Sequence, residues 1–332
     1  MRDAQNHYNF ENKELFEKNF PAQFIAEGLD QTRGWFYTLT VLSAALFRKS
    51  AFQNVIVNGL ILAADGAKMS KRLKNYPDPM EVVTQYGADA IRLYMLHSPA
   101  VKAEDLAFSK QGVEGVLRQI LLPLWNAHLF LMTYARIYSW QPHLDLLQRG
   151  EGRATQPIDR WILSLLHQLI MQVEQGMEEY GRAKAVGPLV VFIDQLTNWY
   201  IRRCRRRFWS EIDVADRTEA FSSLYICLMR FVALAAPFIP FMSESIYRNL
   251  RTTEMEESVH LLRFPSYLPG VRDQVLEAEM EAVQRLVSLG HSLRKEHKMK
   301  VRQPLAAAYV VSSDERICQF LQHQSHLVEE EL

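Results

Sequence analysis

Length, composition and charge indicate a globular chain of two or three domains. The 332 residues are 48% hydrophobic and 23% charged, which suffices to bury at least one full core. Lys plus Arg and Asp plus Glu are equal at 38 each, so a nucleic-acid or membrane partner would be held by local basic patches and not by net charge.

The first part of the chain alternates between strand and helix patterns. Residues 23–26 form a short apolar strand candidate, and residues 32–47 carry apolar side chains at helical spacing, with Asp30 placed as the helix cap. Residues 54–62 are uncharged and rich in Val and Ile, which is typical of a strand buried on both faces in a parallel sheet. The order predicts a βαβ unit whose ligand side is the carboxyl edge of its strands.

Helical patterns dominate from there on. Two short helices are predicted at residues 79–86 and 88–97, with Asp78 and Asp89 near their starts and Gly87 between them. From about residue 111 the pattern changes to long amphipathic segments, which predict a helix bundle. These segments are residues 113–138, 158–180, 187–209 and 217–235.

The last eighty residues are less regular. Residues 258–265 form a strand candidate, and residues 274–298 predict another long helix. The final segment, residues 301–332, begins as a strand and a helix with no closing element, so we expect the chain to stop within a domain.

Targeting and redox signals are absent from the sequence. No apolar run approaches the roughly 18 residues that span a bilayer, and the N-terminal segment is polar where a signal peptide needs an apolar stretch. Cys204, Cys227 and Cys318 lie far apart without metal-ligand spacing, so we predict no disulfide and no zinc. We expect a cytoplasmic protein without a membrane partner.

A basic loop follows the second strand. Residues 63–79, AADGAKMSKRLKNYPDP, place Lys68, Ser70 and Lys71 where two ammonium groups and a hydroxyl can converge on a polyphosphate. The alternative is a solvated basic loop. The order Lys-Met-Ser-Lys-Arg resembles the KMSKS signature of class I aminoacyl-tRNA synthetases, in a variant ending in Arg72. That resemblance implies that Lys68 and Lys71 are catalytic residues and that all three bind ATP phosphates.

A second polar cluster follows the first strand. The sequence AEGLDQTRGWF places Glu27, Asp30 and Gln31 around Gly28, where a backbone turn admits a ligand closely. Helix capping and solvation are the alternative. Together with the lysine loop, this turn resembles isoleucyl-tRNA synthetases. The resemblance implies that the three polar residues contact the amino acid and ribose of the aminoacyl-adenylate, and that Trp35 lines the isoleucine pocket.

A third segment combines arginines with aromatic residues. The sequence TNWYIRRCRRRFW, residues 197–209, suits phosphate contact and base stacking. Its aromatic residues can instead belong to the bundle core, and some arginines can pair with acids such as Glu211 and Asp213. The family places a similar segment in the helical domain that binds the anticodon stem. The predicted RNA-binding residues are Arg202, Arg203, Arg205, Arg206 and Arg207.

The resemblance implies an α/β plus all-α protein: the C-terminal half of a class I Rossmann-type catalytic domain, followed by an anticodon-binding helix bundle. The expected divisions are 1–110, 111–270, and 271–332 as a junction helix and truncated domain. The implied activity is isoleucine–tRNA ligase, with isoleucine, tRNA-Ile, ATP and accompanying Mg²⁺ as partners.

The family's His-x-Gly-His signature is missing, so we expect a fragment that is inactive by itself. The alternatives are a non-catalytic tRNA-binding module, or a valine or methionine enzyme of the same class.

Overall fold

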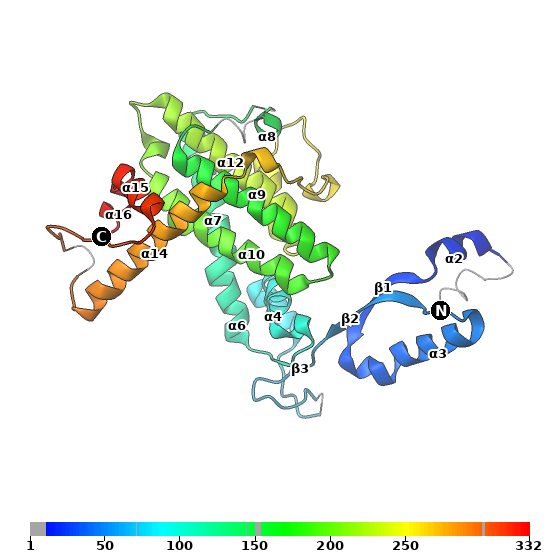
Figure 1. The fold of residues 1–332 in the computed structure, drawn as a ribbon. Helices are drawn as coiled ribbons and strands as arrows, with labels where there is room; N and C mark the ends of the chain where they lie inside the picture. Colours follow the sequence, from blue (N-terminus) through cyan, green and yellow to red (C-terminus); the bar gives the residue numbers. More distant parts are fainter. Residues whose placement is uncertain (1–10, 71, 144, 150–153, 301–302) are drawn as a thin grey trace.

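The structure is a computed structural model that describes residues 11–332 except 71, 144, 150–153 and 301–302. Figure 1 shows a small α/β unit at the N-terminal end and a larger helical bundle, joined through β2 and β3. The coarse prediction of a mixed α/β part followed by a helical part is confirmed.

The α/β unit contains the predicted βαβ element, formed by β1, α3 and β2. Its two long strands pair in parallel, with Phe24 opposite Asn54 and Gly28 opposite Asn58. Since Gly28 and Asn58 are the last residues of their strands, both strands end at the same edge. The elements are α2 (Lys13–Asn19), β1 (Ala22–Gly28), α3 (Trp35–Phe47) and β2 (Phe52–Asn58).

The second strand is shorter than predicted. It ends at Asn58, and after Gly59 and Leu60 the chain forms β3 (Ile61–Leu62), which pairs in parallel with β4 (Leu106–Ala107). A β-carbon on Gly59 would lie 1.7 Å from the carbonyl oxygen of Glu104. The chain therefore crosses a neighbouring backbone here too closely for any side chain.

Burial on both faces was also wrong for this strand. Val55 is 45% exposed and Phe24 on β1 is 49% exposed, whereas Ile25 is buried. Each sheet in the described part of the chain has two strands, so most strand side chains have no neighbouring strand or second layer to cover them.

The two short helices form as predicted, as α4 (Pro79–Tyr86) and α5 (Ala88–Leu96). Asp78 caps α4 by accepting a hydrogen bond from the amide of Met80 at 2.8 Å. Asp89 has a different role, because its buried carboxylate accepts from the amide of Met242 at 2.6 Å, in the first turn of α13. It joins α5 to a helix 150 residues further along.

The helix bundle contains the main core of the protein. The long segments predicted from the sequence are helical, but two of them pass through π-helical turns, at Leu117–Leu121 and Gln195–Ile201. Large side chains such as Trp161, Tyr200 and Phe221 are fully buried. The helices are α6 (Lys110–Val116), α7 (Leu122–Ile137), α8 (Leu146–Arg149), α9 (Pro157–Glu178), α10 (Arg182–Asp194), α11 (Arg202–Cys204), α12 (Val214–Ala235), α13 (Pro240–Leu250) and α14 (Gln274–Glu296).

Helix α12 corrects one sequence expectation. By length and composition it is apolar enough to cross a bilayer, so the prediction of no such run was wrong. Most of its apolar stretch is buried, and it packs against α7, α9 and α13. These contacts are those of a central bundle helix.

The turn between α9 and α10 contacts the α/β unit. Arg182 donates to the side-chain oxygen of Asn58 at 2.5 Å and to the carbonyl oxygen of Val101 at 3.1 Å. The rings of Tyr180 and Phe24 lie 5.4 Å apart. The carboxyl end of β2 is thereby fixed to the bundle.

Two strand predictions near the C-terminus were wrong. Residues 258–265 contain the single 3-10 turn Val259–Leu261, because Glu244 accepts hydrogen bonds from the Ser258 hydroxyl and the Val259 amide. Residues 303–313 form no strand either. The chain ends in α15 (Glu315–His323) and α16 (His326–Glu329), both packed on α14.

Candidate nucleotide and RNA sites

The turn after β1 is built by side-chain hydrogen bonds. The Gln31 side-chain oxygen accepts from the Trp35 amide at 2.9 Å, and its nitrogen donates to Asp30 at 3.1 Å. The N-cap position of α3 is Gly34, and the Gln31 side chain accepts from the first amide of the helix. The prediction that Asp30 caps α3 was wrong, because the 3-10 helix Leu29–Arg33 intervenes. A β-carbon on Gly28 would lie 2.7 Å from Asp30 Oδ1, the end of an exposed side chain that can turn away, so this contact does not by itself require glycine.

Polar groups in this turn remain available to a ligand. Glu27 and Asp30 are exposed. The indole N–H of Trp35 is buried and has no acceptor among the described residues. A buried donor without an acceptor is rare in a folded protein, which makes the Trp35 indole a candidate ligand contact.

The lysine loop begins with a fixed turn. Lys68 forms an antiparallel bridge with Leu62 at the end of β3. Between them, Asp65 accepts from the Ala67 amide at 3.0 Å, and Gly66 has a φ of 79°, which glycine adopts without strain. The Lys68 side chain is exposed and makes no contact with the described residues, so its ammonium group is free to bind an anion.

Asn75 closes the second half of the loop. Its side-chain nitrogen donates to the carbonyl oxygen of Lys68 at 3.1 Å, and its oxygen accepts from the Ser70 amide at 2.8 Å. The Ser70 hydroxyl accepts from the Leu73 amide at 3.4 Å and can still donate to a ligand. Lys71 lies outside the described residues.

The two motifs follow strands that are close in the chain but belong to two sheets. The turn at Glu27 begins at the shared edge where β1 and β2 end, and the lysine loop follows β3, which begins three residues after Asn58 and pairs with β4. The carboxyl edge of parallel strands is where ligands bind in open α/β sheets.

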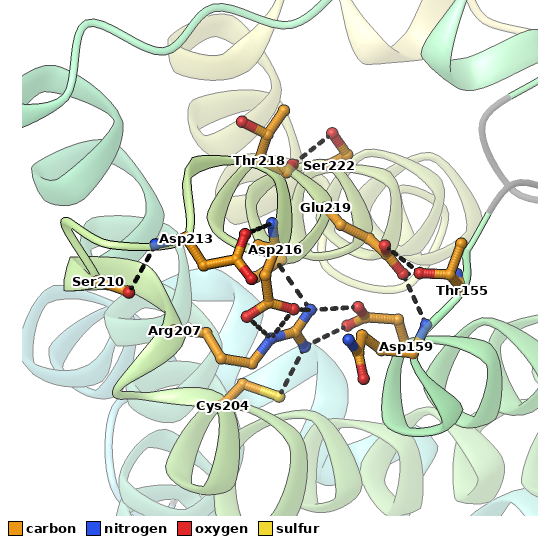
Figure 2. A network of polar contacts seen from close by, with 12 residues as sticks. Thr155, Asp159, Cys204, Arg207, Ser210, Asp213, Asp216, Thr218, Glu219 and Ser222 are labelled. Carbon is orange, nitrogen blue, oxygen red and sulfur yellow. Dashed lines mark hydrogen bonds and ion pairs between the residues drawn. The ribbon is translucent and has the colours of Figure 1, made fainter.

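The arginine segment does not act as a single basic surface. Arg207 points into the bundle, where its guanidinium donates to both oxygens of Asp159, at 3.1 and 2.7 Å, and to Asp216 at 3.0 and 2.9 Å (Figure 2). The Asp159 side chain is fully buried. Tyr200 also donates to Asp159, at 2.6 Å. We call Asp159, Arg207 and Asp216 the buried ion network.

Burial shifts the ionisation of this network. It raises the pKa of Asp159, although the bonds from Arg207 and Tyr200 oppose that rise. Burial opposes the charge on Arg207, but its two carboxylate partners raise the pKa of the guanidinium. Burial raises the pKa of the Cys204 thiol to about 12, so this cysteine stays protonated at neutral pH.

Two further arginines are paired with the C-terminal end of the chain. Arg203, whose side chain is 4% exposed, contacts Glu331 at 2.8 Å and Glu330 at 3.1 Å. Arg202 contacts Glu331 at 2.7 Å and lies over the ring of Trp199. The acids suggested by the sequence, Glu211 and Asp213, are not the partners.

Arg205 and Arg206 are exposed arginines of this segment without a carboxylate partner among the described residues, whereas the exposed Arg202 is paired with Glu331. Arg206 makes no contact with the described residues, and the guanidinium of Arg205 lies 5.9 Å from the Trp209 ring centre. Trp209 lies 5.6 Å from the ring of Tyr134 on α7, and Tyr138 donates to the Trp209 carbonyl oxygen at 3.1 Å. We call Arg205, Arg206 and Trp209 the exposed basic turn.

Sequence reasoning missed Tyr134 on α7 and Tyr138 at its C-cap, because they precede the arginine segment by about seventy residues. Only the packing of α7 against that segment brings them together. Among the described residues, no group of three or more His, Cys, Asp or Glu side chains is arranged to hold a metal ion.

Two family models match the chain. One, described as tRNA synthetases class I (I, L, M and V), matches residues 1–107, and the other, described as anticodon-binding domain of tRNA ligase, matches residues 159–310. Over all 332 residues the chain is 66% identical to the isoleucine–tRNA ligase of Protochlamydia amoebophila. The chain belongs to the class I tRNA synthetases, and over its whole length it is similar to part of an isoleucine–tRNA ligase.

The class I synthetase match contains both the Glu27 turn and the lysine loop, and the anticodon-binding match contains the arginine segment. The isoleucine–tRNA ligase of Chlamydia pneumoniae is 56% identical over the whole chain. The chain spans about a third of the length of these relatives, 32% and 31%.

Solved structures support the fold. The Mycobacterium tuberculosis methionyl-tRNA synthetase in complex with methionyl-adenylate matches 80% of this chain with a TM-score of 0.61 at 19% identity, over 52% of its own length. The LeuRS of Agrobacterium radiobacter, in a ternary complex with tRNA and LeuAMS, matches 79% with a TM-score of 0.58 at 19% identity, over 31% of its length.

Proposed function

We propose that the chain is the part of an isoleucine–tRNA ligase that carries one half of a Rossmann-type catalytic domain and the anticodon-binding bundle. The whole enzyme would activate isoleucine with ATP and transfer it to tRNA-Ile, in the cytoplasm. The observation that carries this proposal is the 66% identity over the full chain to an isoleucine–tRNA ligase. The order of the two polar motifs at strand ends supports it.

In this proposal the lysine loop handles the phosphates of ATP. Lys68 and Lys71 would stabilise negative charge on the leaving pyrophosphate, and the Ser70 hydroxyl would donate to a phosphate oxygen. Mg²⁺ would enter with ATP, whose phosphate oxygens are ligands that it prefers. The fixed backbone around Lys68 suits this role, because it limits the reorganisation needed when ATP binds.

The turn after β1 would hold the other part of the adenylate. Glu27, Asp30 and Gln31 would bind the amino group and the ribose, and Trp35 would line the side-chain pocket. The unsatisfied indole N–H of Trp35 supports a ligand nearby.

RNA contact is proposed for the exposed basic turn. Arg205 and Arg206 would bind phosphates, and Trp209 offers a ring for stacking. Arg202, Arg203 and Arg207 have carboxylate partners within the protein, so they are weaker candidates than the sequence suggested.

A salt titration of RNA binding tests the RNA part. The purified chain is titrated with tRNA-Ile, with tRNA-Val of similar length as competitor. We expect preferential binding of tRNA-Ile and a logarithmic affinity that falls linearly with the logarithm of salt concentration. Equal, salt-insensitive binding of both RNAs would overturn the proposal.

A chimera tests the catalytic part. This chain replaces the matching third of the P. amoebophila enzyme, and isoleucine-dependent pyrophosphate exchange is measured. We expect exchange in the chimera and a large loss in its Lys68→Ala variant, with the KM for isoleucine little changed. A chimera that folds and binds tRNA-Ile but catalyses no exchange would contradict the catalytic assignment.

The second candidate function is a non-catalytic tRNA-binding module. The well-packed bundle favours it, together with strands β1 and β2, whose side chains are half-buried or exposed in this chain except for the buried Ile25. Under this function the isolated chain binds tRNA but has no measurable pyrophosphate exchange. Full exchange by the isolated chain would exclude it.

A further inference from the structure

Arg207 points into the bundle, although it directly follows two exposed arginines. Its side chain is 17% exposed, whereas Arg205 and Arg206, the two residues before it, are exposed. Removing a guanidinium from water is costly unless carboxylates compensate. Asp159 from α9 and Asp216 from α12 supply that compensation, so two separate helices set the inward direction of one arginine (Figure 2).

The other end of the same turn is also fixed. The Trp209 carbonyl oxygen accepts from Tyr138, and the Ser210 carbonyl oxygen accepts from Arg217 at 2.5 Å. The guanidinium of Arg217 in turn lies 3.9 Å from the Tyr138 ring centre. The turn at residues 205–210 is therefore held at two points. The ion pairs of Arg207 hold it from inside the bundle, and the bonds from Tyr138 and Arg217 hold residues 209–210.

We propose that Asp159 and Asp216 are positioning residues for RNA binding: by drawing Arg207 inward, they hold the turn in the conformation that presents Arg205 and Arg206 to the RNA. This rests on the proposed RNA-binding function. The two acids never touch RNA. They act through Arg207, and the gain is a turn ordered before the RNA arrives, which lowers the entropy lost on binding.

Arg207 anchors the turn, whereas Arg205 and Arg206 are exposed on it, because they occupy different positions along the turn. Arg207 lies in the 3-10 helix Arg207–Trp209, and Arg205 and Arg206 form the bend that precedes it. If Arg207 were released, the bend would keep only its apolar neighbours, the buried Cys204 and Phe208, and would lose its ion pairs to the bundle. Arg205 and Arg206 would then be less ordered before the RNA binds.

The test uses Asp216→Asn in the full 332-residue chain, with tRNA-Ile as the probe. Asp216 is 18% exposed, and the asparagine keeps a hydrogen-bond acceptor, so the variant is expected to fold. The control is Asp89→Asn, the same change in a buried carboxylate that accepts from first-turn amides of α13 and has no hydrogen bond or ion pair with the arginine segment. Both variants are expected to lower the melting temperature.

The variants should differ in RNA binding. If two phosphate contacts become ineffective, affinity at 0.15 M salt falls by about tenfold and the salt slope weakens by about 1.4. Asp216→Asn should show both effects, matching the double variant Arg205→Ala/Arg206→Ala, whose melting temperature should not change. Asp89→Asn should bind as the unmodified chain does.

Amide hydrogen exchange gives an independent readout. Residues 205–210 should exchange faster in Asp216→Asn and not in Asp89→Asn. The inference is overturned if Asp216→Asn binds tRNA-Ile within twofold of the unmodified chain, or weakens binding no more than Asp89→Asn does. Failure of the unmodified chain to bind tRNA-Ile would instead refute the proposed RNA-binding function, and the positioning role with it.

Discussion

Asp159→Ala should be among the most destabilising single changes in the bundle. The carboxylate is fully buried and accepts from Arg207 at 3.1 and 2.7 Å and from the Tyr200 hydroxyl at 2.6 Å. Its removal leaves a largely buried guanidinium with one carboxylate partner. It also leaves the Tyr200 hydroxyl with only the Ala220 carbonyl oxygen at 3.5 Å.

The expected cost is about 4 kcal/mol. Breaking a buried ion pair from one side typically costs about 3–5 kcal/mol, and the poorly satisfied Tyr200 hydroxyl belongs within that range. The remaining bond of Arg207 to Asp216 keeps the loss from being larger. A cost of this size is a large fraction of the roughly 5–15 kcal/mol that stabilises a typical domain.

Urea unfolding followed by helical circular dichroism measures this cost. With a slope of about 3 kcal/mol per molar urea, the midpoint should fall by about 1.3 M. Asp159→Asn, which can still accept from Tyr200, should lose less than Asp159→Ala.

A double-mutant cycle with Arg207→Met provides the decisive comparison. The double variant should lose at least about 2 kcal/mol less unfolding free energy than the two single variants lose in sum. In the double variant neither a buried carboxylate nor a buried guanidinium is left without its partner. Strict additivity, or a loss below about 1 kcal/mol for Asp159→Ala, would show that the network is not a stabilising pair.

Three further predictions concern other sites. Thiol reagents at pH 8 should modify Cys318 before Cys204, whose pKa is about 12; equal rates, measured by mass spectrometry, would contradict the structure. Partial desolvation raises the pKa of Glu219, but bonds from Thr155 and Gln156 lower it more. The stabilisation by this carboxylate is therefore present above its unfolded pKa and is lost as pH falls through its folded pKa. Glu219→Gln should therefore flatten the fall in melting temperature below pH 4.5, and an unchanged pH profile would refute that role. Asn75→Ala should speed tryptic cleavage in the lysine loop at unchanged melting temperature, and an unchanged cleavage rate would mean that the Asn75 bonds do not hold the loop.

The sequence alone determined the order of elements and their broad type. Period-two and helical patterns are local properties of a strand or a helix, so the βαβ unit, helices α4 and α5 and the long bundle helices could be predicted from them. The two short motifs were equally local, and they identified the family because their residues lie within a few positions of one another.

Tertiary structure decided the strand ends and the caps. The second strand ends at Asn58 because the backbone of Glu104 passes against Gly59, a contact between residues 45 positions apart. Asp89 was predicted near the start of its own helix, but its carboxylate serves the first turn of α13, 153 positions away.

Tertiary structure also decided which arginines are available. The sequence gives no reason to distinguish the five arginines of residues 202–207, because they are the same residue type within one short segment. Arg207 pairs with Asp159, 48 positions earlier, and Arg203 pairs with Glu331, 128 positions later, so neither is free to bind RNA phosphates. Because electrostatic pairing depends on distance in space and not along the chain, only the packing of the helices separates Arg205 and Arg206 from their neighbours.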